Sequence, residues 1–499
     1  MFSIVIARRY SDEAIYQHIV FYEIAEFIPI IISGDYLAMT DQFMIMNTSI
    51  FKAYDIRGIY PNDLNEDLAY RIAQAYVKII KPQGKVAIGM DVRLHSPQLR
   101  GAVIKGLIEA GIDVLDIGLI STEMLYFAVG YYGLAGGIQI TASHNSAEWN
   151  GMKMVREKVK PISSDNGIFE IRDTILANQD KIASDLIGQI EKKDVLDDFV
   201  IFCLNKFVDV AKIKPLKLVY NPSFGFGGEV LKRAVELGNL PIELAGLNDT
   251  PDGSFPKGRP DPSREENRGE FVQKVIEREA DLGVAWDADA DRVFFCTKDG
   301  KFVEPYFMNA LFIKYILEKN SSSKIIYDPR YTWALIDSAK ENGGEALIER
   351  VGHSFIKEKM AQENAIFSGE SSGHTYFRDF WYADSGLIPL LIVLEIVSNN
   401  SLDDLLDPLW NKYIISGEIN QQLDNRELAD KIIKQIKEKY SDAQIDLTDG
   451  LSIEYNRDWR ANIRASNTEP LLRLNVEAKS RELMEEKRDE ILDYIKHIT

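Results

Sequence analysis

Ser143 lies in the first of four short segments whose side chains could do chemistry. The apolar run that ends at Ile140 is followed by Thr-Ala-Ser-His-Asn and, after Gly151, by Lys153. Small polar residues after an apolar run are typical of a loop at a strand end, where α/β proteins usually place their sites. Ser143 beside His144 suggests nucleophilic catalysis, but neighbouring side chains rarely face each other and the sequence Gly-x-Ser-x-Gly is missing here. Nucleophilic catalysis and a plain turn both stay open for this segment.

The second segment carries three aspartates that alternate with alanines after the apolar run 282–286: Asp287, Asp289 and Asp291. On an extended strand the outer two would lie roughly 13 Å apart, at about 3.3 Å per residue. One Mg²⁺ ion, with bonds of about 2.1 Å, could not reach both. We therefore expect the chain to curl here around a hard divalent cation such as Mg²⁺, which carboxylates favour. A calcium loop does not fit, because Arg292 and Lys298 stand where that loop needs glycine and glutamate; a solvated acidic turn stays open.

The third and fourth segments could bind a sugar and a phosphate. Gly369-Glu-Ser-Ser-Gly-His374 offers a carboxylate, hydroxyls and an imidazole, which suit sugar hydroxyls. Arg464-Ala-Ser-Asn-Thr-Glu-Pro470 offers a guanidinium, hydroxyls and amide donors that suit a phosphate dianion, with Arg473 beyond it. Plain turns are the alternative for both. A further segment, Gly-Phe-Gly-Gly at 225–228, lacks a following lysine and the dinucleotide spacing, so we interpret it as structural.

Alternating helix and strand patterns must position these segments. A helical face runs from Leu68 to Ile80 and is stopped by Pro82 and Gly84. A strand at 86–89, a helix at about 98–110 and a strand at 112–117 follow. The alternation returns as a strand at 216–220 with a helix at 229–237, and again across 306–367, which predicts α/β layered domains. In the tail we expect a helix near 425–440, strands near 451–455, 461–465 and 471–478, and a helix at 481–498.

These patterns divide the chain into five parts. We expect an N-terminal extension at 1–45 and four domains at 46–196, 197–301, 302–412 and 413–499, each of which carries one of the four segments.

The N-terminal segment is apolar from Ile19 to Ile32 but carries Glu23, Glu26 and Pro29, so it is too short and too charged to span a bilayer. It also lacks the basic start and the small-residue cleavage site of a signal peptide. We expect a cytoplasmic protein that does not interact with a membrane, and we interpret the residues before about position 44 or 46 as an extension outside the main fold, for which an upstream start is one explanation.

Composition narrows the possible partners. Apolar residues make up 45% and charged residues 27% of the chain, and the formal net charge is −19. That charge repels nucleic acid, so we expect none as a partner, while a phosphate substrate needs only a local group of cations. Cys203 and Cys296 lie in apolar sequence, and we interpret them as two buried thiols in a reducing compartment.

Taken together, the segments resemble the α-D-phosphohexomutase superfamily, most closely its phosphomannomutase/phosphoglucomutase branch. The resemblance covers about Ile50 to the C-terminus. It depends on six motifs in this order: Phe51-Lys-Ala-Tyr-Asp-Ile-Arg-Gly58, Thr141-Ala-Ser-His-Asn145, Asp287-Ala-Asp-Ala-Asp-Arg292, Gly352-His353, Gly369-Glu-Ser-Ser-Gly-His374 and Arg464-Ala-Ser-Asn-Thr-Glu-Pro470.

The resemblance implies a fold and an activity. The fold would have three related α/β layered domains and a smaller C-terminal α+β domain around a central cleft. The activity would be interconversion of hexose 1-phosphate and hexose 6-phosphate, with mannose, glucose or both as the hexose. The phosphoryl group would pass through a phosphoserine at Ser143 and a hexose 1,6-bisphosphate. Small hexose phosphates would be the ligands, and the protein would be a monomer or a small homo-oligomer.

The resemblance also implies residue roles. The Mg²⁺ ligands would be the phosphoserine and the three aspartates: Ser143, Asp287, Asp289 and Asp291. Beside Ser143, the catalytic group would include Arg57, Lys153 and His374, the last two as candidates for proton transfer. The substrate would contact Tyr54, Arg292, Arg330, His353, Glu370, Ser372, Arg464, Ser466, Asn467, Thr468 and Arg473. Of these, Glu370 and Ser372 would bind the 3- and 4-hydroxyls of the sugar and leave the 2-hydroxyl free.

Three departures from the family pattern bear on these roles. Ser146 replaces a usual proline, and we expect a looser Ser143 loop as a result. Ala288 and Ala290 replace frequent glycines, so we expect both to avoid positive φ. Arg330 stands where a lysine commonly contacts the substrate, which could tune specificity.

Other functions stay open. Phosphoglucosamine mutases usually begin Phe-Gly-Thr-Asp-Gly-Ile-Arg-Gly, unlike the motif at 51–58. A non-catalytic sugar-phosphate-binding protein of the same fold and a hydrolase are the further alternatives.

Overall fold

The computed structural model describes residues 46–423, 427–465 and 471–498, and the fold below is that of the unit Ser49–Thr499. The predicted extension at 1–45 lies outside the described residues.

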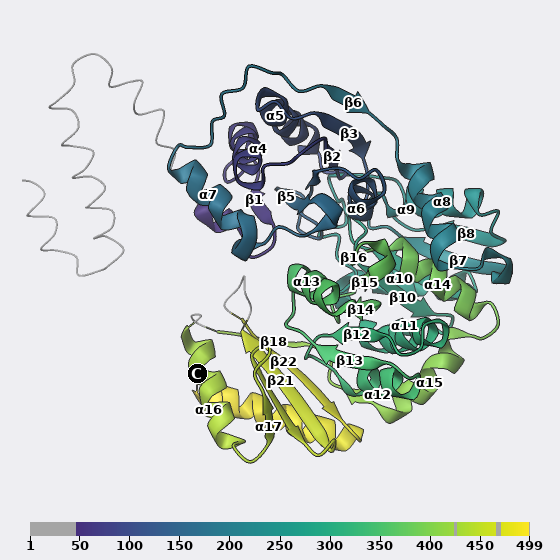
Figure 1. Ribbon diagram of the computed structural model, residues 1–499. Helices are drawn as coiled ribbons and strands as arrows, with labels where there is room; N and C mark the ends of the chain where they lie inside the picture. The colour runs from purple at the N-terminus through teal and green to yellow at the C-terminus, as the bar shows by residue number, and fades with distance from the viewer. Residues whose placement is uncertain (1–45, 424–426, 466–470, 499) are drawn as a thin grey trace, which may run out of the picture. The chain divides into compact units, whose positions relative to one another are not determined.

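The first sheet has six strands in the order β1-β5-β4-β2-β3-β6. Strands β4, β2, β3 and β6 run parallel, while β5 and β1 are added antiparallel at one edge. Helix α4 begins where the Asn65 side chain accepts a hydrogen bond from the Leu68 amide, and it packs beside α5 (Figure 1). The elements are β1 (Ile56–Ile59), α4 (Glu66–Ile80), β2 (Val86–Met90), α5 (Ser96–Glu109), β3 (Val114–Leu119), α6 (Thr122–Tyr131), β4 (Gly136–Ile140), β5 (Trp149–Arg156), α7 (Phe169–Leu176) and β6 (Ile190–Lys192).

The second sheet has five strands in the order β11-β10-β9-β7-β8, with β9, β7 and β8 parallel and β10 and β11 antiparallel. Its elements are α8 (Leu196–Phe207), β7 (Leu216–Asn221), α9 (Gly227–Leu237), β8 (Ile242–Gly246), α10 (Gly269–Glu277), β9 (Leu282–Trp286), β10 (Val293–Thr297) and β11 (Phe302–Val303).

The third sheet repeats this plan in the order β13-β12-β14-β15-β16, with β13, β12 and β14 parallel and β15 and β16 antiparallel. Its elements are α11 (Pro305–Lys319), β12 (Lys324–Tyr327), α12 (Trp333–Glu341), β13 (Glu345–Ile348), α13 (His353–Glu363), β14 (Phe367–Gly369), β15 (Thr375–Phe377), β16 (Ala383–Asp384), α14 (Leu387–Val397) and α15 (Leu402–Lys412).

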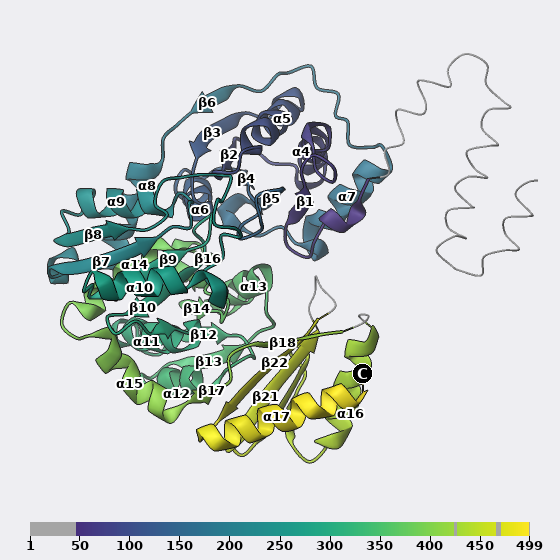
Figure 2. The same cartoon turned by 180° about the vertical axis from the view of Figure 1, so that it is seen from behind.

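The fourth sheet is entirely antiparallel, in the order β17-β22-β21-β20-β19 with β18 also paired to β22. Helices α16 and α17 cover it, and Figure 2 shows α17 crossing β21 and β22. The elements are β17 (Ile414–Ile415), β18 (Ile419–Gln422), α16 (Glu427–Lys439), β19 (Gln444–Asp446), β20 (Leu451–Tyr455), β21 (Trp459–Ala465), β22 (Leu471–Ala478) and α17 (Arg481–Ile498). Short helical turns complete the chain: η1 (Thr48–Ile50), η2 (Glu157–Val159), η3 (Ser164–Ile168), η4 (Val210–Lys212), η5 (Glu265–Asn267) and η6 (Arg378–Phe380).

The first three sheets are therefore built on one plan. In each, three neighbouring parallel strands are followed by an antiparallel pair at one edge: β3-β2-β4 with β5-β1, β8-β7-β9 with β10-β11, and β13-β12-β14 with β15-β16. A continuous apolar core joins these three layers, and it includes Leu125, Phe199 and Leu391. The fourth sheet has its own core, with Ile432, Leu474 and Ile491. The predicted fold class, three related α/β units with a C-terminal α+β unit, is confirmed.

The structure shifts some predicted element ends. The helix expected at 98–110 begins at Ser96, because Pro97 fits the first helical turn. The helix expected at 229–237 begins at Gly227. Its first two residues are glycines that pack closely against the side chains of Ala290 and Pro222. Cys203 and Cys296 are free and buried, as expected.

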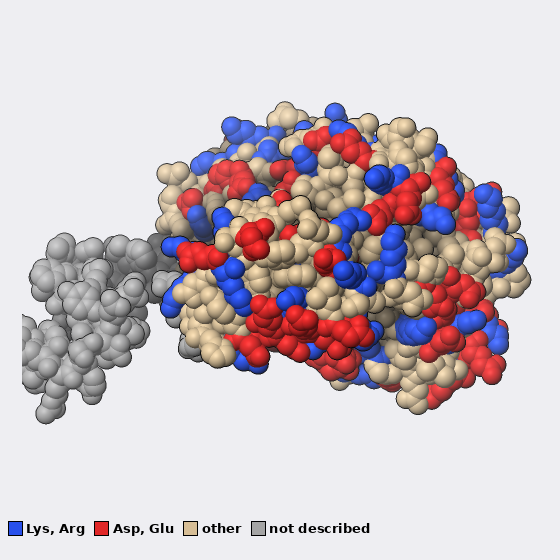
Figure 3. All heavy atoms as spheres, turned by 90° about the horizontal axis from the view of Figure 1, so that it is seen from below, with Lys and Arg blue, Asp and Glu red and all other residues tan. Residues whose placement is uncertain are grey.

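Acidic and basic side chains are not evenly mixed on the surface (Figure 3). Figure 3 shows acidic side chains in contiguous groups on one face, with basic side chains scattered between them. Among the described residues, none of the helices has the length and apolar character needed to cross a membrane.

Candidate active site

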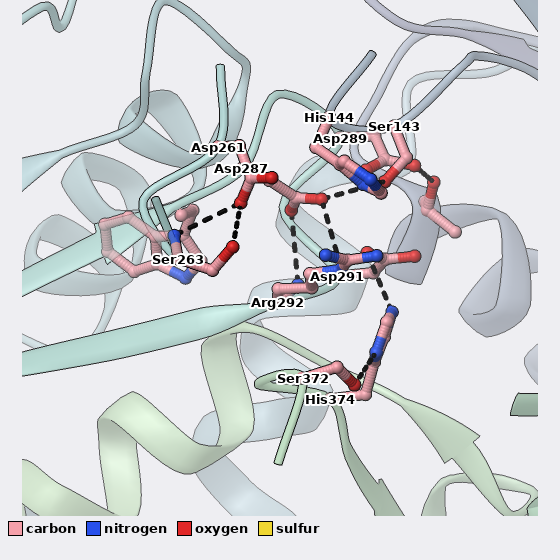
Figure 4. A network of polar contacts seen from close by, with 12 residues as sticks. Ser143, His144, Asp261, Ser263, Asp287, Asp289, Asp291, Arg292, Ser372 and His374 are labelled. Carbon is pink, nitrogen blue, oxygen red and sulfur yellow. Dashed lines mark hydrogen bonds and ion pairs between the residues drawn. The ribbon is translucent and has the colours of Figure 1, made fainter. Parts of the chain in front are cut away.

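Three functional loops occupy the same position in the three related sheets. Each loop joins the third parallel strand to the first antiparallel strand: 141–148 between β4 and β5, 287–292 between β9 and β10, and 370–374 between β14 and β15. Figure 4 shows that side chains from these loops meet, with Ser143, Asp287 and His374 in one polar network. The repeated plan thus brings together segments that are far apart in sequence.

Ser143 lies on a tight turn at the end of β4. Its φ of 50° is in the left-handed region, and its amide donates to Thr141 Oγ1 at 2.9 Å. Its hydroxyl donates to Asp287 Oδ2 at 2.9 Å and lies 3.1 Å from His144 Nδ1. The expectation that Ser143 and His144 do not face each other is therefore wrong, because the left-handed turn folds the two side chains together.

This pair is not arranged as a hydrolytic triad. Burial and the nearby Arg292, Arg57 and Arg259 guanidinium groups hold the pKa of His144 well below its usual value. In a triad a carboxylate bonds the histidine and stabilises its charged form. Here Asp287 bonds the serine, and cations surround the imidazole.

The three aspartates curl as expected. One ligand oxygen from each lies within 4.8 Å of the others, and all three side chains are buried. The Ala290 amide donates to the Asp287 carbonyl at 3.1 Å, which closes the turn. Ala290 has φ of 57°, so the expectation that it avoids positive φ is wrong. Alanine has the smallest side chain that carries a Cβ, and the roughly 1–2 kcal/mol that a left-handed residue costs is outweighed by the packing of the turn.

The same carboxylates fit a hard divalent cation. Asp289 Oδ1 is buried and has no hydrogen-bond partner among the described residues. Burial and the charges of Asp289 and Asp291 raise the pKa of Asp287 well above its usual value. An orphaned oxygen and mutual repulsion within an all-oxygen donor set are what a bound Mg²⁺ would relieve.

Three cations surround these carboxylates. Lys153 Nζ donates to Asp289 Oδ2 at 2.7 Å and also to Asp291 Oδ2. Burial opposes its charge, but the two aspartates outweigh burial and raise the pKa of Lys153, so the amine stays protonated. Arg57 NH1 donates to the Asn145 side chain at 2.8 Å, and Arg292 Nε lies 3.8 Å from Asp287 Oδ2.

The loop at 370–374 presents a second polar group. The buried Glu370 carboxylate accepts from the Tyr376 hydroxyl at 2.5 Å and from the Gly352 amide at 3.2 Å. Ser372 Oγ lies 3.1 Å from His374 Nδ1, and His374 Nε2 lies 3.4 Å from Asp291 Oδ1. His374 therefore joins this loop to the aspartates.

Three further predicted side chains lie around this loop. Arg330 is buried and bonds Asp328 through two nitrogens, at 3.0 and 2.8 Å, and one of these nitrogens lies 3.8 Å from Glu370. Tyr54 and His353 make an edge contact with ring centroids 4.7 Å apart. Neither ring nitrogen of His353 has a hydrogen-bond partner within the described part of the chain.

The predicted phosphate-binding segment is described only in part. Arg464 and Arg473 face each other across β21 and β22, and both pair with Glu418 at 3.4 Å. Ser466, Asn467 and Thr468 lie outside the described residues.

Family models match most of the chain. The domains described as phosphoglucomutase/phosphomannomutase α/β/α domains I, II and III match residues 48–181, 197–300 and 304–413, and the C-terminal domain matches 418–494. The chain belongs to the phosphoglucomutase/phosphomannomutase family.

Individual relatives agree with this membership. An Escherichia coli phosphomannomutase is 45% identical over 89% of this chain and 99% of the relative, and a Vibrio cholerae phosphomannomutase is 42% identical over 90% and 98%. A solved phosphoglucomutase/phosphomannomutase family protein from Burkholderia thailandensis has a TM-score of 0.82 at 33% identity, covering 91% of this chain and 98% of that one. The resemblance found in the sequence is confirmed, and the chain is a phosphohexomutase, an isomerase.

One residue that shapes the site of this phosphohexomutase was not predicted from the sequence. Arg93 is fully buried, and its guanidinium donates to the carbonyls of four residues in the Ser143 loop and its end: Ser143, Asn145, Ser146 and Trp149. Asp91 pairs with Arg93 Nε at 3.1 Å. The sequence did contain a signal for a functional role of Arg93. Asp91-Val-Arg93 directly follows the apolar strand 86–90, just as Asp287 directly follows the apolar strand 282–286.

Proposed function

We propose that this phosphohexomutase interconverts hexose 1-phosphate and hexose 6-phosphate, with mannose, glucose or both as the hexose, through a phosphoserine at Ser143. The observation that carries the proposal is the contact of Ser143 Oγ with the aspartate cluster, at 2.9 Å from Asp287, among buried cations. Phosphoryl transfer needs charge stabilisation and alignment more than covalent help from the protein, and this site offers both. The named phosphomannomutase relatives favour mannose phosphates among the substrates.

The transfer balances as two displacements. In the first, the bond between phosphorus and Ser143 Oγ breaks, phosphorus bonds to the free sugar hydroxyl oxygen, and that hydroxyl loses its proton. The product is a hexose 1,6-bisphosphate and an unmodified Ser143. In the second, after the sugar has turned around, the Ser143 hydroxyl loses its proton and Oγ bonds to the phosphorus of the other phosphate. The bond between that phosphorus and the sugar oxygen breaks, and this oxygen takes up a proton to give the isomeric monophosphate.

Lys153 and His374 are the candidates for moving the protons. Lys153 is held protonated by Asp289 and Asp291, so of the two it is the candidate donor to Ser143 Oγ as that oxygen leaves phosphorus. Because the two carboxylates raise its pKa, these contacts must loosen before the proton is given up. His374, within 3.4 Å of Asp291, is the candidate to accept the proton of the sugar hydroxyl. Arg57 and Arg292 would stabilise the transferred phosphoryl group.

Mg²⁺ is the proposed metal. Asp287, Asp289, Asp291 and an oxygen of the phosphoserine would hold it. When bound, it would neutralise the charge of the phosphoserine, which carries about −1.5 to −2 at neutral pH.

Sugar and distal phosphate would be held by the remaining residues. Glu370 and Ser372 would bind the 3- and 4-hydroxyls, with Tyr54, His353 and Arg330 lining a central cleft. The distal phosphate would contact Arg464, Ser466, Asn467, Thr468 and Arg473. Because this set does not read the 2-hydroxyl, glucose and mannose phosphates would both fit.

The proposal keeps the wider expectations from the sequence. The domains would be 46–196, 197–301, 302–412 and 413–499, after an extension at 1–45. The protein would act in the cytoplasm as a monomer or small homo-oligomer, on small hexose phosphates.

Intact-mass measurement and peptide mapping test the covalent step. We expect protein incubated with glucose 1,6-bisphosphate to carry one phosphate on Ser143. Ser143→Ala should lose that phosphate and at least 10³-fold in kcat, because the relay has no other acceptor. Ser146→Ala in the same loop is the matched control and should keep both. Wild-type protein that cannot be charged by the bisphosphate would contradict the mechanism.

Substrate and metal assays separate the alternatives. Mannose 1-phosphate and glucose 1-phosphate should turn over, and faster turnover of glucosamine 6-phosphate would favour a phosphoglucosamine mutase. Sustained release of free phosphate would favour a hydrolase, and binding without turnover a sugar-phosphate-binding protein. A chelator should abolish activity, and added Mg²⁺ should restore it.

A further inference from the structure

Two arginines face each other on neighbouring strands of the fourth sheet. Arg464 on β21 is directly opposite Arg473 on β22 in the antiparallel register. Like charges placed opposite each other destabilise a sheet. Arg330, after β12, adds a third positive charge, and it contributes with Arg473 to lowering the pKa of Arg464 beyond the effect of burial. Such a pair needs an anion.

In the structure the anion is Glu418. Its Oε2 lies 3.4 Å from an Arg464 nitrogen and its Oε1 lies 3.4 Å from an Arg473 nitrogen, so each carboxylate oxygen serves one arginine. Glu418 directly precedes β18, whose pairing with β22 sets Asn420 opposite Arg473 and so brings residue 418 close to the two arginines. Burial alone would raise the pKa of Glu418, but Arg330, Arg473 and Arg464 outweigh burial and lower it, so the carboxylate is charged.

The contacts of Glu418 are loose. Charge-assisted hydrogen bonds are usually about 2.7–2.9 Å long, and Arg330 bonds Asp328 at 3.0 and 2.8 Å through two nitrogens. Glu418 holds its arginines at 3.4 Å, and 29% of its side chain is exposed to solvent. A carboxylate held in this way can be exchanged for another anion that arrives from solvent.

Each of the two arginines also has a hydrogen-bond donor that no described residue accepts. The Nε atoms of Arg464 and Arg473 are buried, and neither has a hydrogen-bond partner in the ranges that the structure describes. The Arg464 side chain is only 6% exposed. A buried donor without a partner is costly, so both groups favour the arrival of a ligand with several acceptor oxygens, such as a phosphate.

We propose that Glu418 is a positioning residue that acts as an exchangeable counter-ion. It pairs with Arg464 and Arg473 when the distal phosphate of the sugar is absent, and it releases both arginines when that phosphate binds. This inference rests on the proposed function. A hexose bisphosphate must release its distal phosphate and turn around between the two transfers. Glu418 returns to the arginines as the phosphate leaves, so the two cations are never left unpaired, and the protein loses some affinity but gains in turnover.

A non-reacting ligand tests the exchange. 1,5-Anhydroglucitol 6-phosphate lacks the C1 hydroxyl and can bind without accepting a phosphoryl group. In calorimetric titrations we expect Glu418→Gln to bind it about three- to tenfold more tightly than the wild type, because the competing charge is gone. The KM for hexose 6-phosphate should fall together with kcat, and glucose 1,6-bisphosphate should dissociate more slowly.

Two variants control for charge and structure. Glu438→Gln makes the same change of charge on the exposed side of α16 and should leave the dissociation constant unchanged. Glu418→Asp keeps the negative charge, and its dissociation constant should lie closer to that of the wild type than that of Glu418→Gln does. If Glu418→Gln does not fold, Glu418→Ala provides the same comparison.

The outcomes separate this inference from the proposed function. Unchanged or weaker ligand binding by Glu418→Gln, with an active wild type, would overturn the exchange and leave the mutase function standing, since a carboxylate that only props the arginines would weaken binding when removed. A wild type that neither binds the ligand nor turns over hexose phosphates would overturn the proposed function itself.

Discussion

The Arg93 guanidinium holds the Ser143 loop by its main chain. It donates at 2.6–2.9 Å to four carbonyls, and the aromatic ring of Phe255 lies 5.0 Å from its central carbon. The backbone of the loop is thereby fixed without a proline at Ser146, where the sequence suggested a looser loop. Ser146 contributes its carbonyl to this set and its hydroxyl to Glu148 at 2.7 Å.

Replacing Arg93 with lysine should therefore damage both stability and catalysis. A lysine keeps the charge, but a single ammonium group with three donors cannot satisfy the four carbonyls and Asp91. We expect Arg93→Lys to lose about 2–4 kcal/mol of unfolding free energy, because buried carbonyls lose their donor. We expect kcat/KM to fall about 10- to 100-fold, because Ser143 is misplaced. Thermal unfolding and steady-state assays measure the two effects.

Arg100 offers a matched control for Arg93. It lies on α5 in the same unit and pairs with Asp116 at 2.9 Å, with 23% of its side chain exposed. Arg100→Lys should change kcat/KM by less than about twofold. Equal activity of Arg93→Lys and wild-type protein would show that the loop does not need the guanidinium.

For single residues, the sequence predicted the chemical groups of the site better than their backbone conformations and contacts. The types and spacing of the three aspartates predicted a turn that brings the carboxylates together, and the structure has that turn. The left-handed φ of Ala290 and the contact of Ser143 with His144 could not be predicted, because the fold decides which backbone conformation a loop residue must adopt. Arg93 was missed because its partners in the Ser143 loop are main-chain carbonyls; the Asp91-x-Arg93 pair in the sequence gives no information about which loop the guanidinium holds.

Among the elements, the repeated antiparallel hairpin places the site. Strands β4, β9 and β14 each end in a loop that carries functional side chains, and β5, β10 and β15 return antiparallel. Periodicity predicted several strands and helices with nearly their observed bounds, among them β2, β7 and α17, because apolar spacing reports one buried face. It could not predict which strands pair or that the three loops are equivalent, because pairing depends on contacts between residues far apart in sequence.

The turn at 223–226, directly before α9, packs against the aspartate loop at 287–292. A Cβ at Gly225 would lie 2.1 Å from the Ala288 carbonyl oxygen, a distance that no side chain can occupy. The turn is also tied to the strand before the aspartates, since Ser223 Oγ donates to the Trp286 carbonyl at 2.7 Å. This agrees with the structural interpretation of the segment and gives it a role in shaping the site.

Gly225→Ala should consequently push the aspartate loop out of place. We expect a loss of about 1–3 kcal/mol of stability from overpacking, weaker Mg²⁺ activation and a lower kcat. Gly269→Ala at the start of α10 is the control, because a Cβ there meets nothing within 4 Å. Activity measured against Mg²⁺ concentration compares the two variants. A Gly225→Ala enzyme with an unchanged Mg²⁺ dependence would show that the loop yields without losing its metal site.

Across the whole molecule, Glu123 connects the first α/β unit, which contains sheet β1–β6, with the third, which contains sheet β12–β16. It lies on α6, and its Oε2 accepts from the Gly386 and Leu387 amides at 2.9 and 3.1 Å, and from the Ser385 hydroxyl, at the start of α14. The neighbouring Thr122 donates to Asp289 Oδ2 at 2.7 Å, so the same helix end reaches the aspartate cluster. The sequence could not predict this connection, because its partners lie more than 260 residues apart.

The charge state of Glu123 should make stability depend on pH. Burial raises the pKa of Glu123 to about 7, although three hydrogen bonds oppose the rise. Because the folded protein holds this proton more tightly than the unfolded chain, whose pKa is near 4.5, the group stabilises the fold fully below about pH 4.5. That stabilisation is lost as the pH rises through about 7, and it amounts to roughly 3 kcal/mol. Glu123→Gln, which does not titrate, should lack this loss.

Thermal midpoints of wild-type and variant protein between pH 5 and 8 measure the difference. We expect the midpoint of the wild type to fall relative to that of Glu123→Gln as the pH rises. Glu318→Gln, at an exposed position on α11, should keep the wild-type slope. A wild type that gains stability over Glu123→Gln with rising pH would mean that the hydrogen bonds at the start of α14 outweigh burial. The connection between the two units would then be strongest with the carboxylate ionised.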